Sequence, residues 1–239
     1  KKSVLVEYHS LTTGNLPFLR DAIKRTLNLR GDHYMFLNEA VRKNMFFSPS
    51  TPHGVRGMGF DRDLVKVVAG SRKKYDFVYS GSTGRVGVFA AIEKLLRLGF
   101  SVAVVGNSAD DVCQFSSLAK SHVRFFGKVT LPDSYKIISE ARFGLNFTPD
   151  IYPFNIQDST KVIEYCALGL GVVTNRYEWV SRFENSVDAR FLNFDSITSR
   201  VDVEEFRFAN GRLDEYAWDR IIEKSGLRMK IQELATRSS

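Results

Sequence analysis

The chain has few of the residues that mark metal sites, disulfide frameworks or membrane spans. It is 239 residues long, with two cysteines, four histidines and six prolines. Cys113 and Cys166 both lie in apolar stretches of helical pattern, so we expect reduced thiols and a cytoplasmic protein rather than a disulfide. The scattered histidines offer no metal-ligand spacing. No apolar run approaches the ~20 residues that cross a bilayer, and the run after Lys1 and Lys2 is too short for a signal peptide.

The positive charge is concentrated in the first third of the chain. The net charge is +7, whereas residues 1–74 alone hold 14 Lys/Arg and 6 Asp/Glu, a balance of +8. A basic surface of this kind is either simply solvated or meets an anionic partner. Because no nucleic-acid-binding motif accompanies it, we expect peripheral contact with the inner face of the cell membrane and no nucleic-acid partner.

Between Tyr75 and Asn175 the sequence alternates strands and helices with short connections. The expected strands are 76–80, 101–106, 123–127, 142–148 and 171–174, and the expected helices are 84–98, 110–120, 132–141 and one that begins after Ser159 and ends at Gly169. This alternation predicts an α/β fold with a doubly wound, Rossmann-like parallel sheet. Ligands in such folds bind beyond the carboxyl ends of the strands, so the candidate binding loops are 81–85, 106–109, 127–131 and 149–159.

The first 66 residues predict a smaller lobe. The expected elements are strands at 3–9 and 34–37 and helices at 17–29 and 39–46, which are too few for an independent Rossmann half. We therefore expect a partial N-terminal lobe at 1–66 and a basic linker at 65–74. A second domain at 67–239 would end in helices near 213–224 and 228–236.

The segment 159–175 holds the first candidate site. Lys161 lies in the first turn of the expected helix, where the helix dipole disfavours a cation unless an anion is near. Ser159 is the expected N-cap, and Thr160 and Lys161 would face a diphosphate. Glu164 has apolar neighbours, and a buried carboxylate needs a partner, such as the two hydroxyls of a ribose. The alternatives are plain capping by Ser159, a solvated lysine and a helix-surface glutamate.

A glycine-rich turn after the first strand of the alternating region is the second candidate. Gly81, Gly84 and Gly87 have the spacing G-x-x-G-x-x-G, which is neither a dinucleotide fingerprint nor a Walker loop. Glycines let the backbone approach a ligand closely, and free amides at a helix start favour anions. Arg85 would add a forked, charge-assisted contact to a phosphate. An ordinary tight turn is the alternative interpretation.

Four sequence landmarks occur in a fixed order between residues 57 and 175. They are GMGFD at 57–61, YSG at 79–81 with RVG at 85–87, VRFFGKV at 123–129, and STK at 159–161 followed by EYCALGLGVV at 164–173. In this order they resemble family 4 (group 1) retaining glycosyltransferases of the GT-B fold, mainly their C-terminal donor-binding domain. The last landmark is similar to that family's E-Y-x-A-x-G-x-P-V-V segment.

The resemblance implies an enzyme of hexosyltransferase type that moves a sugar from a nucleotide-sugar donor to a glycan or lipid-linked acceptor, as in polysaccharide biosynthesis. Configuration would be retained, and no metal or cofactor would be needed. Glu164 would bind the ribose, and Arg85 and Lys161 would neutralise the diphosphate and act in catalysis. The implied donor site consists of Gly81, Ser82, Arg85, Phe126, Gly127, Lys128, Val129, Ser159, Thr160, Lys161 and Glu164, with the base held by main-chain groups of 126–129.

The chain also departs from the family pattern. Ile156 stands where the family has an earlier glutamate, so the sugar contact is expected from loop 149–159, where Asp150 and Asp158 are candidates or simply solvated acids. Gly171 replaces the common proline. His9, after the first strand, is either a further catalytic residue on the acceptor side or a structural histidine.

The short first lobe leaves three other functions open. The chain could be a fragment that is inactive alone, or a non-catalytic nucleotide-sugar-binding subunit completed by a partner that supplies the acceptor lobe. A sugar-nucleotide epimerase of the same fold would form product without any acceptor. A basic nucleic-acid-binding protein would instead show strongly salt-dependent binding.

Overall fold

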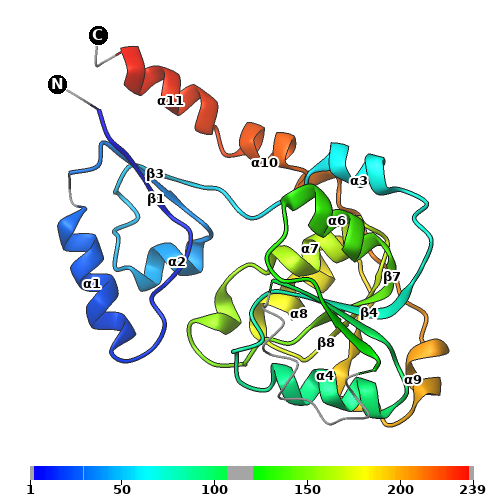
Figure 1. The fold of residues 1–239 in the computed structure, drawn as a ribbon. Coiled ribbons are helices and arrows are strands. Elements are labelled where there is room, and N and C mark those ends of the chain that lie inside the picture. The colour runs from blue at the N-terminus through cyan, green and yellow to red at the C-terminus, as the bar shows by residue number, and fades with distance from the viewer. Residues whose placement is uncertain (1–2, 29, 107–120, 237–239) are drawn as a thin grey trace. The chain divides into compact units, whose positions relative to one another are not determined.

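The computed structural model describes residues 3–28, 30–106 and 121–236, which form two compact units (Figure 1). The first unit combines residues 1–59, 151–159 and 214–239, and the second combines 60–150 and 160–213. Each unit is built on a parallel sheet. Cys113 and the helix expected at 110–120 lie outside the described residues. Among the helices that are described, none is long and apolar enough to cross a bilayer.

The second unit contains a six-stranded, wholly parallel sheet. Its strands are β4 (Tyr75–Ser80), β5 (Val102–Val105), β6 (Val123–Phe125), β7 (Ala141–Asn146), β8 (Gly171–Thr174) and β9 (Leu192–Asn193). They lie in the order β6-β5-β4-β7-β8-β9. Numbered along the chain this is the order 3-2-1-4-5-6 of doubly wound nucleotide-binding folds. The predicted fold class is therefore confirmed.

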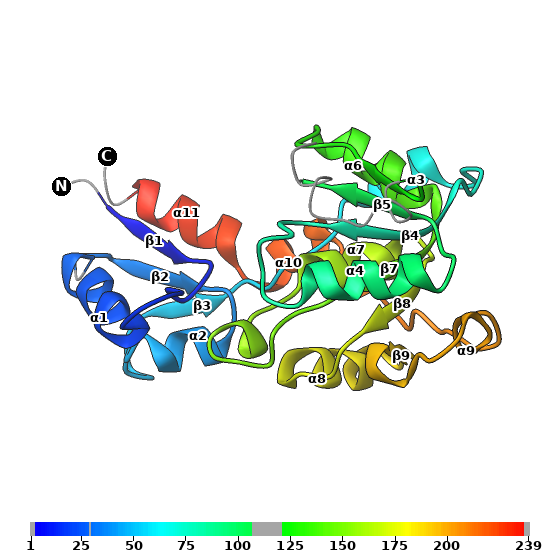
Figure 2. The ribbon, with the colours of Figure 1, turned by 60° about the horizontal axis from the view of Figure 1, so that its bottom comes forward.

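Helices cover both faces of this sheet. They are α3 (Arg62–Val68), α4 (Val88–Arg97), α6 (Leu131–Ser139), α7 (Thr160–Ala167), α8 (Glu178–Val187) and α9 (Arg200–Glu204). Figures 1 and 2 show α4 on one face and α6 and α7 on the other. Burial of α4 drives its packing, because Val88, Ile92, Leu95 and Leu96, the residues predicted to share a face, are all buried. The helix begins four residues later than expected, since residues 81–87 form a loop.

The first unit is smaller, and packed aromatic rings form much of its core. Its sheet has the order β1-β2-β3, with β1 (Leu5–Tyr8), β2 (His33–Phe36) and β3 (His53–Val55) all parallel. Its helices are α1 (Pro17–Leu27), α2 (Glu39–Asn44), α10 (Trp218–Lys224) and α11 (Leu227–Thr236), together with the 3-10 turn η2 (Phe154–Ile156). Tyr8 stacks on Phe36 with ring centroids 5.5 Å apart, and Phe47 packs edge-on against Phe36 at 5.1 Å.

The two units differ from the domains that the sequence suggested at 1–66 and 67–239. The chain leaves the first unit at Gly59, and the C-terminal helices belong to that unit. A Cβ at Gly59 would lie 2.8 Å from the Ile221 side chain and 3.2 Å from the Trp218 ring, so α10 packs closely on the end of the first segment. The prediction of a linker at 65–74 is wrong. The first residues of this segment belong to α3, which lies within the second unit.

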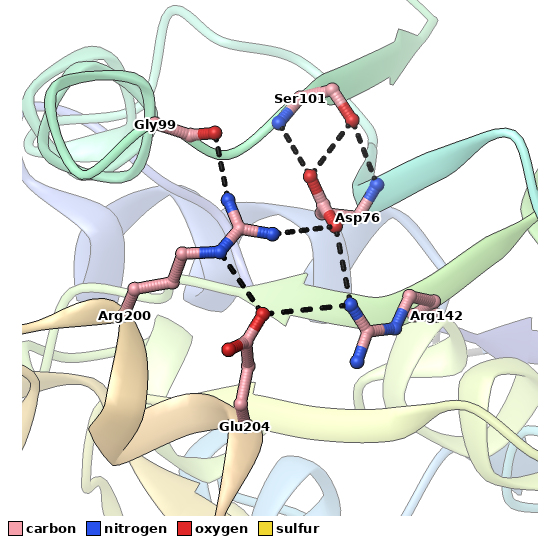
Figure 3. Close-up of polar contacts among 6 residues, drawn as sticks. All are labelled: Asp76, Gly99, Ser101, Arg142, Arg200 and Glu204. Carbon is pink, nitrogen blue, oxygen red and sulfur yellow. Dashed lines mark hydrogen bonds and ion pairs between the residues drawn. The ribbon is translucent and has the colours of Figure 1, made fainter.

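A polar cluster fastens α9 to the amino end of the six-stranded sheet (Figure 3). The Asp76 carboxylate accepts hydrogen bonds from the backbone and hydroxyl of Ser101 at 2.9 and 3.0 Å. It also lies 3.4 Å from a guanidinium nitrogen of both Arg142 and Arg200. Arg200 pairs with Glu204 at 2.9 Å. The cluster lies at the strand starts, so it stabilises the edge that ligands of this fold do not use.

Candidate functional site

The carboxyl edge of the six-stranded sheet carries little side-chain bulk. A glycine follows each of three neighbouring strands. Gly81 directly follows β4, Gly106 directly follows β5, and Gly127 lies two residues after the end of β6. The Gly81 amide donates to the Val105 carbonyl at 2.8 Å, and the Gly106 amide donates to the Gly127 carbonyl at 2.8 Å. Gly81 and Gly106 have φ of +137° and +104°, and a Cβ at Gly106 would lie 3.1 Å from the Gly81 oxygen. Glycine is therefore required there, and the backbone at this edge can be approached closely.

Lys161 lies above this edge, in the first turn of α7. Its Nζ atom is buried and makes no hydrogen bond to any residue that the structure describes. It lies 4.4 Å from the centre of the Tyr79 ring and 3.3 Å from the position of a Cβ at Gly81. Burial, and then the nearby charge of Arg85, lower the pKa of Lys161 to about 7, against the opposing effect of Glu164. A buried ammonium without an anionic partner is costly, so the position suits a bound anion.

The loop after β4 is shaped by Tyr79. The Tyr79 hydroxyl donates to the Ser82 carbonyl at 2.8 Å, and the Ser82 hydroxyl accepts the Gly84 amide at 3.3 Å. Burial raises the pKa of Tyr79 to about 12, although the charge of Arg85 opposes the shift. Arg85 itself is exposed. Because its charge acts on both Tyr79 and Lys161, the loop places a second cation beside the buried amine.

Glu164 lies one helical turn beyond Lys161. Burial raises the pKa of Glu164 to about 7, opposed by a hydrogen bond with Tyr135 and by the charge of Lys161. The Tyr135 hydroxyl also accepts the Asp61 amide at 3.0 Å. Tyr135 is buried, and burial raises its pKa. The carboxylate is thus held by a rigid phenol, and the predicted apolar surroundings are present.

In the segment after β6, the backbone of Phe126 is bonded to β5 and its ring packs on neighbouring side chains. The Phe126 amide donates to the Val104 carbonyl at 2.9 Å. Its ring lies 5.1 Å from the Arg124 guanidinium and 6.0 Å, edge-on, from the Tyr75 ring. Lys128 is exposed and Val129 half-buried. The contact of a base with main-chain groups of 126–129, which the resemblance implies, stays a prediction.

The start of α7 lies where the chain passes between the units. Ser159 ends the middle segment of the first unit, and Thr160 begins both α7 and the second segment of the second unit. The structure therefore brings Gly81, Lys161 and Glu164 to the carboxyl edge of one sheet. Tyr79, which is part of the YSG landmark, and Tyr135 belong to this group but were not predicted as site residues. Each is an aromatic residue in an apolar element, which predicts only core packing.

His9 lies in the first unit, within a polar cluster. Its Nε2 lies 2.9 Å from a Glu7 carboxylate oxygen, and its Nδ1 lies 3.1 Å from an Arg56 nitrogen. The same Arg56 nitrogen also lies 3.3 Å from Nε2. Arg56 also lies 5.4 Å from the Trp218 ring. His9 is thus oriented and half-exposed, and a catalytic role for it stays a prediction.

Asp158, a candidate for the sugar contact, is hydrogen-bonded within the first unit, and a contact with a sugar stays a prediction. It accepts the Asn38 side-chain amide at 2.8 Å and the Met58 backbone amide at 3.3 Å. These bonds hold segment 151–159 on the first unit. Ile156, which replaces the family's acid, is buried in the core of the same unit. Asp150 is exposed.

Comparisons of sequence give no match: no family model and no curated protein matches this chain. Comparisons of structure do. A trehalose 6-phosphate synthase from Burkholderia multivorans is similar with a TM-score of 0.65 and 13% identity, over 100% of this chain and 68% of that one. HepE from Anabaena, in complex with UDP, gives 0.61 and 13%, over 98% and 71%.

A third similar structure is a glycosyltransferase involved in avilamycin A biosynthesis, with a TM-score of 0.60 and 15% identity, over 84% of this chain and 64% of that one. The chain thus spans about two thirds of the length of these proteins. At such identities the likeness concerns the fold, and it establishes the GT-B glycosyltransferase fold expected from the sequence landmarks.

Proposed function

We propose that the second unit binds a nucleotide sugar at the carboxyl edge of its sheet and that the protein transfers the sugar, with retention, to a glycan or lipid-linked acceptor. The observation that carries the proposal is the buried amine of Lys161, which faces Gly81 and lies near the charge of Arg85. Structures of the same fold support it, since one is a complex with UDP and another is bound with UDP-2-fluoro glucose.

The donor would lie across the edge in a defined direction. The diphosphate would accept from Lys161, Arg85 and the free amides at the start of α7, where anions are favoured. The ribose hydroxyls would donate to Glu164, and the base would bind main-chain groups of 127–129. The substrate would thereby supply the anion that the Lys161 amine needs in this buried position.

Catalysis would follow from charge that grows on the diphosphate. The bond between the anomeric carbon and the diphosphate oxygen breaks, and a bond to the acceptor oxygen forms on the same face. The acceptor proton passes to the leaving phosphate. Lys161 and Arg85 bind the developing negative charge more tightly in the transition state than in the ground state, so they accelerate this step. No metal is required, because the two cations neutralise the charge that a metal would otherwise offset.

The acceptor would bind to the first unit. Its polar cluster of Glu7, His9 and Arg56 offers hydrogen-bond donors and acceptors of the kind that sugar hydroxyls need. We place the reaction in the cytoplasm, at the inner face of the membrane, because a lipid-linked acceptor would be met there.

Calorimetric titration with UDP-, GDP- and ADP-sugars and with inorganic pyrophosphate tests the donor site. We expect one nucleotide sugar to bind and pyrophosphate to bind more weakly. Lys161→Met should abolish both interactions, whereas Lys66→Met, which removes an exposed lysine of the same unit, should leave both intact. Failure of all nucleotides to bind the wild-type protein would rule out the donor site.

A non-catalytic donor-binding subunit is the second candidate. One observation favours it: Ile156 occupies the place of the family's earlier acid in a buried position. This alternative predicts donor binding without transfer to any acceptor. Hydrolysis or transfer of a bound sugar by the isolated chain would exclude it.

A further inference from the structure

Helix α1 of the first unit has its polarity reversed. A surface helix normally turns its apolar face to the core and its charges to solvent. In α1 the single acid, Asp21, is fully buried, and its carboxylate accepts the Thr12 hydroxyl at 2.6 Å and the Thr12 amide at 3.0 Å. Arg25 also turns inward, with its guanidinium 5.5 Å from the Phe47 ring. The side chains of Asp21 and Arg25 therefore lie on the inner side of the helix.

The outward side of α1 is apolar. Leu16, Leu19, Ile23 and Leu27 are exposed to 68%, 56%, 50% and 77%. Leu19, Ile23 and Leu27 are four residues apart, so they form one continuous stripe along the helix. Leu16 is the exposed N-cap residue directly before α1. Figures 1 and 2 show α1 at the outside of the first unit. The exposed fractions of Leu19, Ile23 and Leu27 leave their side chains open to solvent. Exposed apolar surface of this length marks an interaction site.

The charges beside the stripe identify its partner. Arg20 and Lys24 are exposed and follow Leu19 and Ile23 by one position, so they flank the stripe along one side. No acidic residue of the helix faces outward, since Asp21 is buried. If a second copy of the chain docked face to face with its α1 antiparallel, these cations would come together and repel each other. An anionic, apolar surface satisfies both features.

We propose that α1 is a membrane-docking helix that lies in the interface of an anionic bilayer, with Leu16, Leu19, Ile23 and Leu27 inserted among the acyl chains and Arg20 and Lys24 at the phosphate headgroups. Amphipathic helices bind membranes through this combination of buried apolar area and attraction to anionic lipid. The inference is independent of the donor site, because α1 belongs to the other unit.

Flotation with vesicles tests the proposal. Vesicles of phosphatidylcholine with phosphatidylglycerol should carry the wild-type protein, and vesicles of phosphatidylcholine alone should carry much less. The combined variant Leu19→Ser, Ile23→Ser and Leu27→Ser should lower the partition coefficient at least about tenfold. Arg20→Gln and Lys24→Gln should each lower binding to the anionic vesicles about fivefold.

Matched control variants remove exposed residues of the same kinds from the second unit. Val67→Ser with Val201→Ser, at positions that are 79% and 53% exposed, should leave vesicle binding unchanged. Lys66→Gln with Arg97→Gln should lower it far less than the α1 charge variants. Nucleotide titration of every variant should match the wild-type protein, which separates this test from that of the donor site.

Two results would overturn the proposal. One is vesicle binding that persists at wild-type strength in the stripe variant. The other is a wild-type protein that sediments as a dimer, does not bind vesicles and becomes a monomer in the stripe variant, because the occupant of the stripe would then be a second copy of the chain.

Discussion

The Nζ atom of Lys161 lies 4.4 Å from the centre of the Tyr79 ring and makes no hydrogen bond within the part of the chain that the structure describes. The ring face offers partial compensation for the buried charge, and the same tyrosine donates to Ser82 at 2.8 Å. Tyr79 therefore contacts both the buried amine, through its ring, and the loop after β4, through its hydroxyl. This relationship is the basis of the first predictions.

Lys161→Met should separate stability from binding. The change removes a buried, unpaired amine and keeps the length of the side chain, so the free energy of unfolding should rise by about 1–3 kcal/mol. Affinity for pyrophosphate should be lost, and any transfer rate should fall by about 10²–10³. Thermal unfolding and calorimetry measure the two effects. A variant that is less stable and still binds pyrophosphate would identify Lys161 as a structural residue.

Binding of a diphosphate should be coupled to uptake of a proton by Lys161. Its pKa is about 7 without a ligand, and a bound anion raises it. Affinity should therefore fall as pH rises above about 7, by up to about tenfold per pH unit. Calorimetry in buffers of different ionisation enthalpy counts the protons. An acid–base titration of the ligand alone gives the contribution of the ligand itself, and binding to the wild-type protein without proton uptake above pH 7 would refute the coupling.

Glu164→Gln should weaken binding of the nucleoside part of the donor without weakening binding of its phosphates. The amide still accepts from Tyr135, so the fold is kept, but the charge that attracts two ribose hydroxyls is lost. Affinity for the nucleoside diphosphate should fall about tenfold or more, while affinity for pyrophosphate stays near that of the wild type. Tyr135→Phe, which releases the carboxylate, should cause a smaller loss in the same direction. Equal losses for both ligands would argue against a ribose site.

The stability of the protein should depend on pH through Glu164. Burial raises its pKa from 4.5 to about 7 in the folded state, so the folded protein holds this proton more tightly than the unfolded chain does. This contribution to stability is therefore fully present below about pH 4.5 and is lost as pH rises through 7. Melting temperatures of wild type and Glu164→Gln across this range should converge at low pH and diverge at neutral pH, with the variant the more stable.

Gly81→Ala should disturb the anion site itself. Its φ of +137° strains any L side chain, and the added Cβ would lie 3.3 Å from the Lys161 amine. We expect a loss of about 1–2 kcal/mol in stability and a clear loss of nucleotide affinity. Gly169→Ala is the matched control, because φ there is +73° and nothing lies within 4 Å of the new Cβ. It should cost similar stability without affecting the ligand.

Asp76→Ala should lower stability without affecting the site. The carboxylate loses its bonds to Ser101, Arg142 and Arg200 (Figure 3), which should cost about 2–3 kcal/mol of unfolding free energy. Nucleotide affinity should stay at the wild-type level, since the cluster lies at the amino end of the sheet. Asp63→Ala, which removes an exposed ion pair, should change stability by less than about 0.5 kcal/mol.

Local patterns predicted the second unit well because its elements are continuous in sequence. The β-branched pair Val172-Val173 and the flanking glycines predicted β8 within its observed bounds, Gly171–Thr174. The helical spacing after Ser159 likewise predicted α7. The short strand β3 and the helices α3 and α8 were not predicted, because a three-residue strand or a mixed polar helix has a weak periodic signal.

The grouping of segments into units needed the tertiary structure. Helices α10 and α11 follow the second unit in sequence but pack on the first, through contacts such as Gly59 with Ile221 that join residues far apart in the chain. The sequence suggested a sugar contact or a solvated acid for Asp158, and only the tertiary structure shows its hydrogen bonds to Asn38 and Met58. No local pattern encodes such partners.

By itself, the sequence determined the alternating α/β architecture and a cation and a carboxylate three residues apart at one helix start, since these follow from residue spacing along single elements. Only the tertiary structure decided that the amine of Lys161 is buried without a hydrogen-bond partner among the described residues, that Tyr135 holds Glu164, and that α1 turns its apolar stripe outward. Burial and hydrogen-bond partnership depend on segments that meet only after folding.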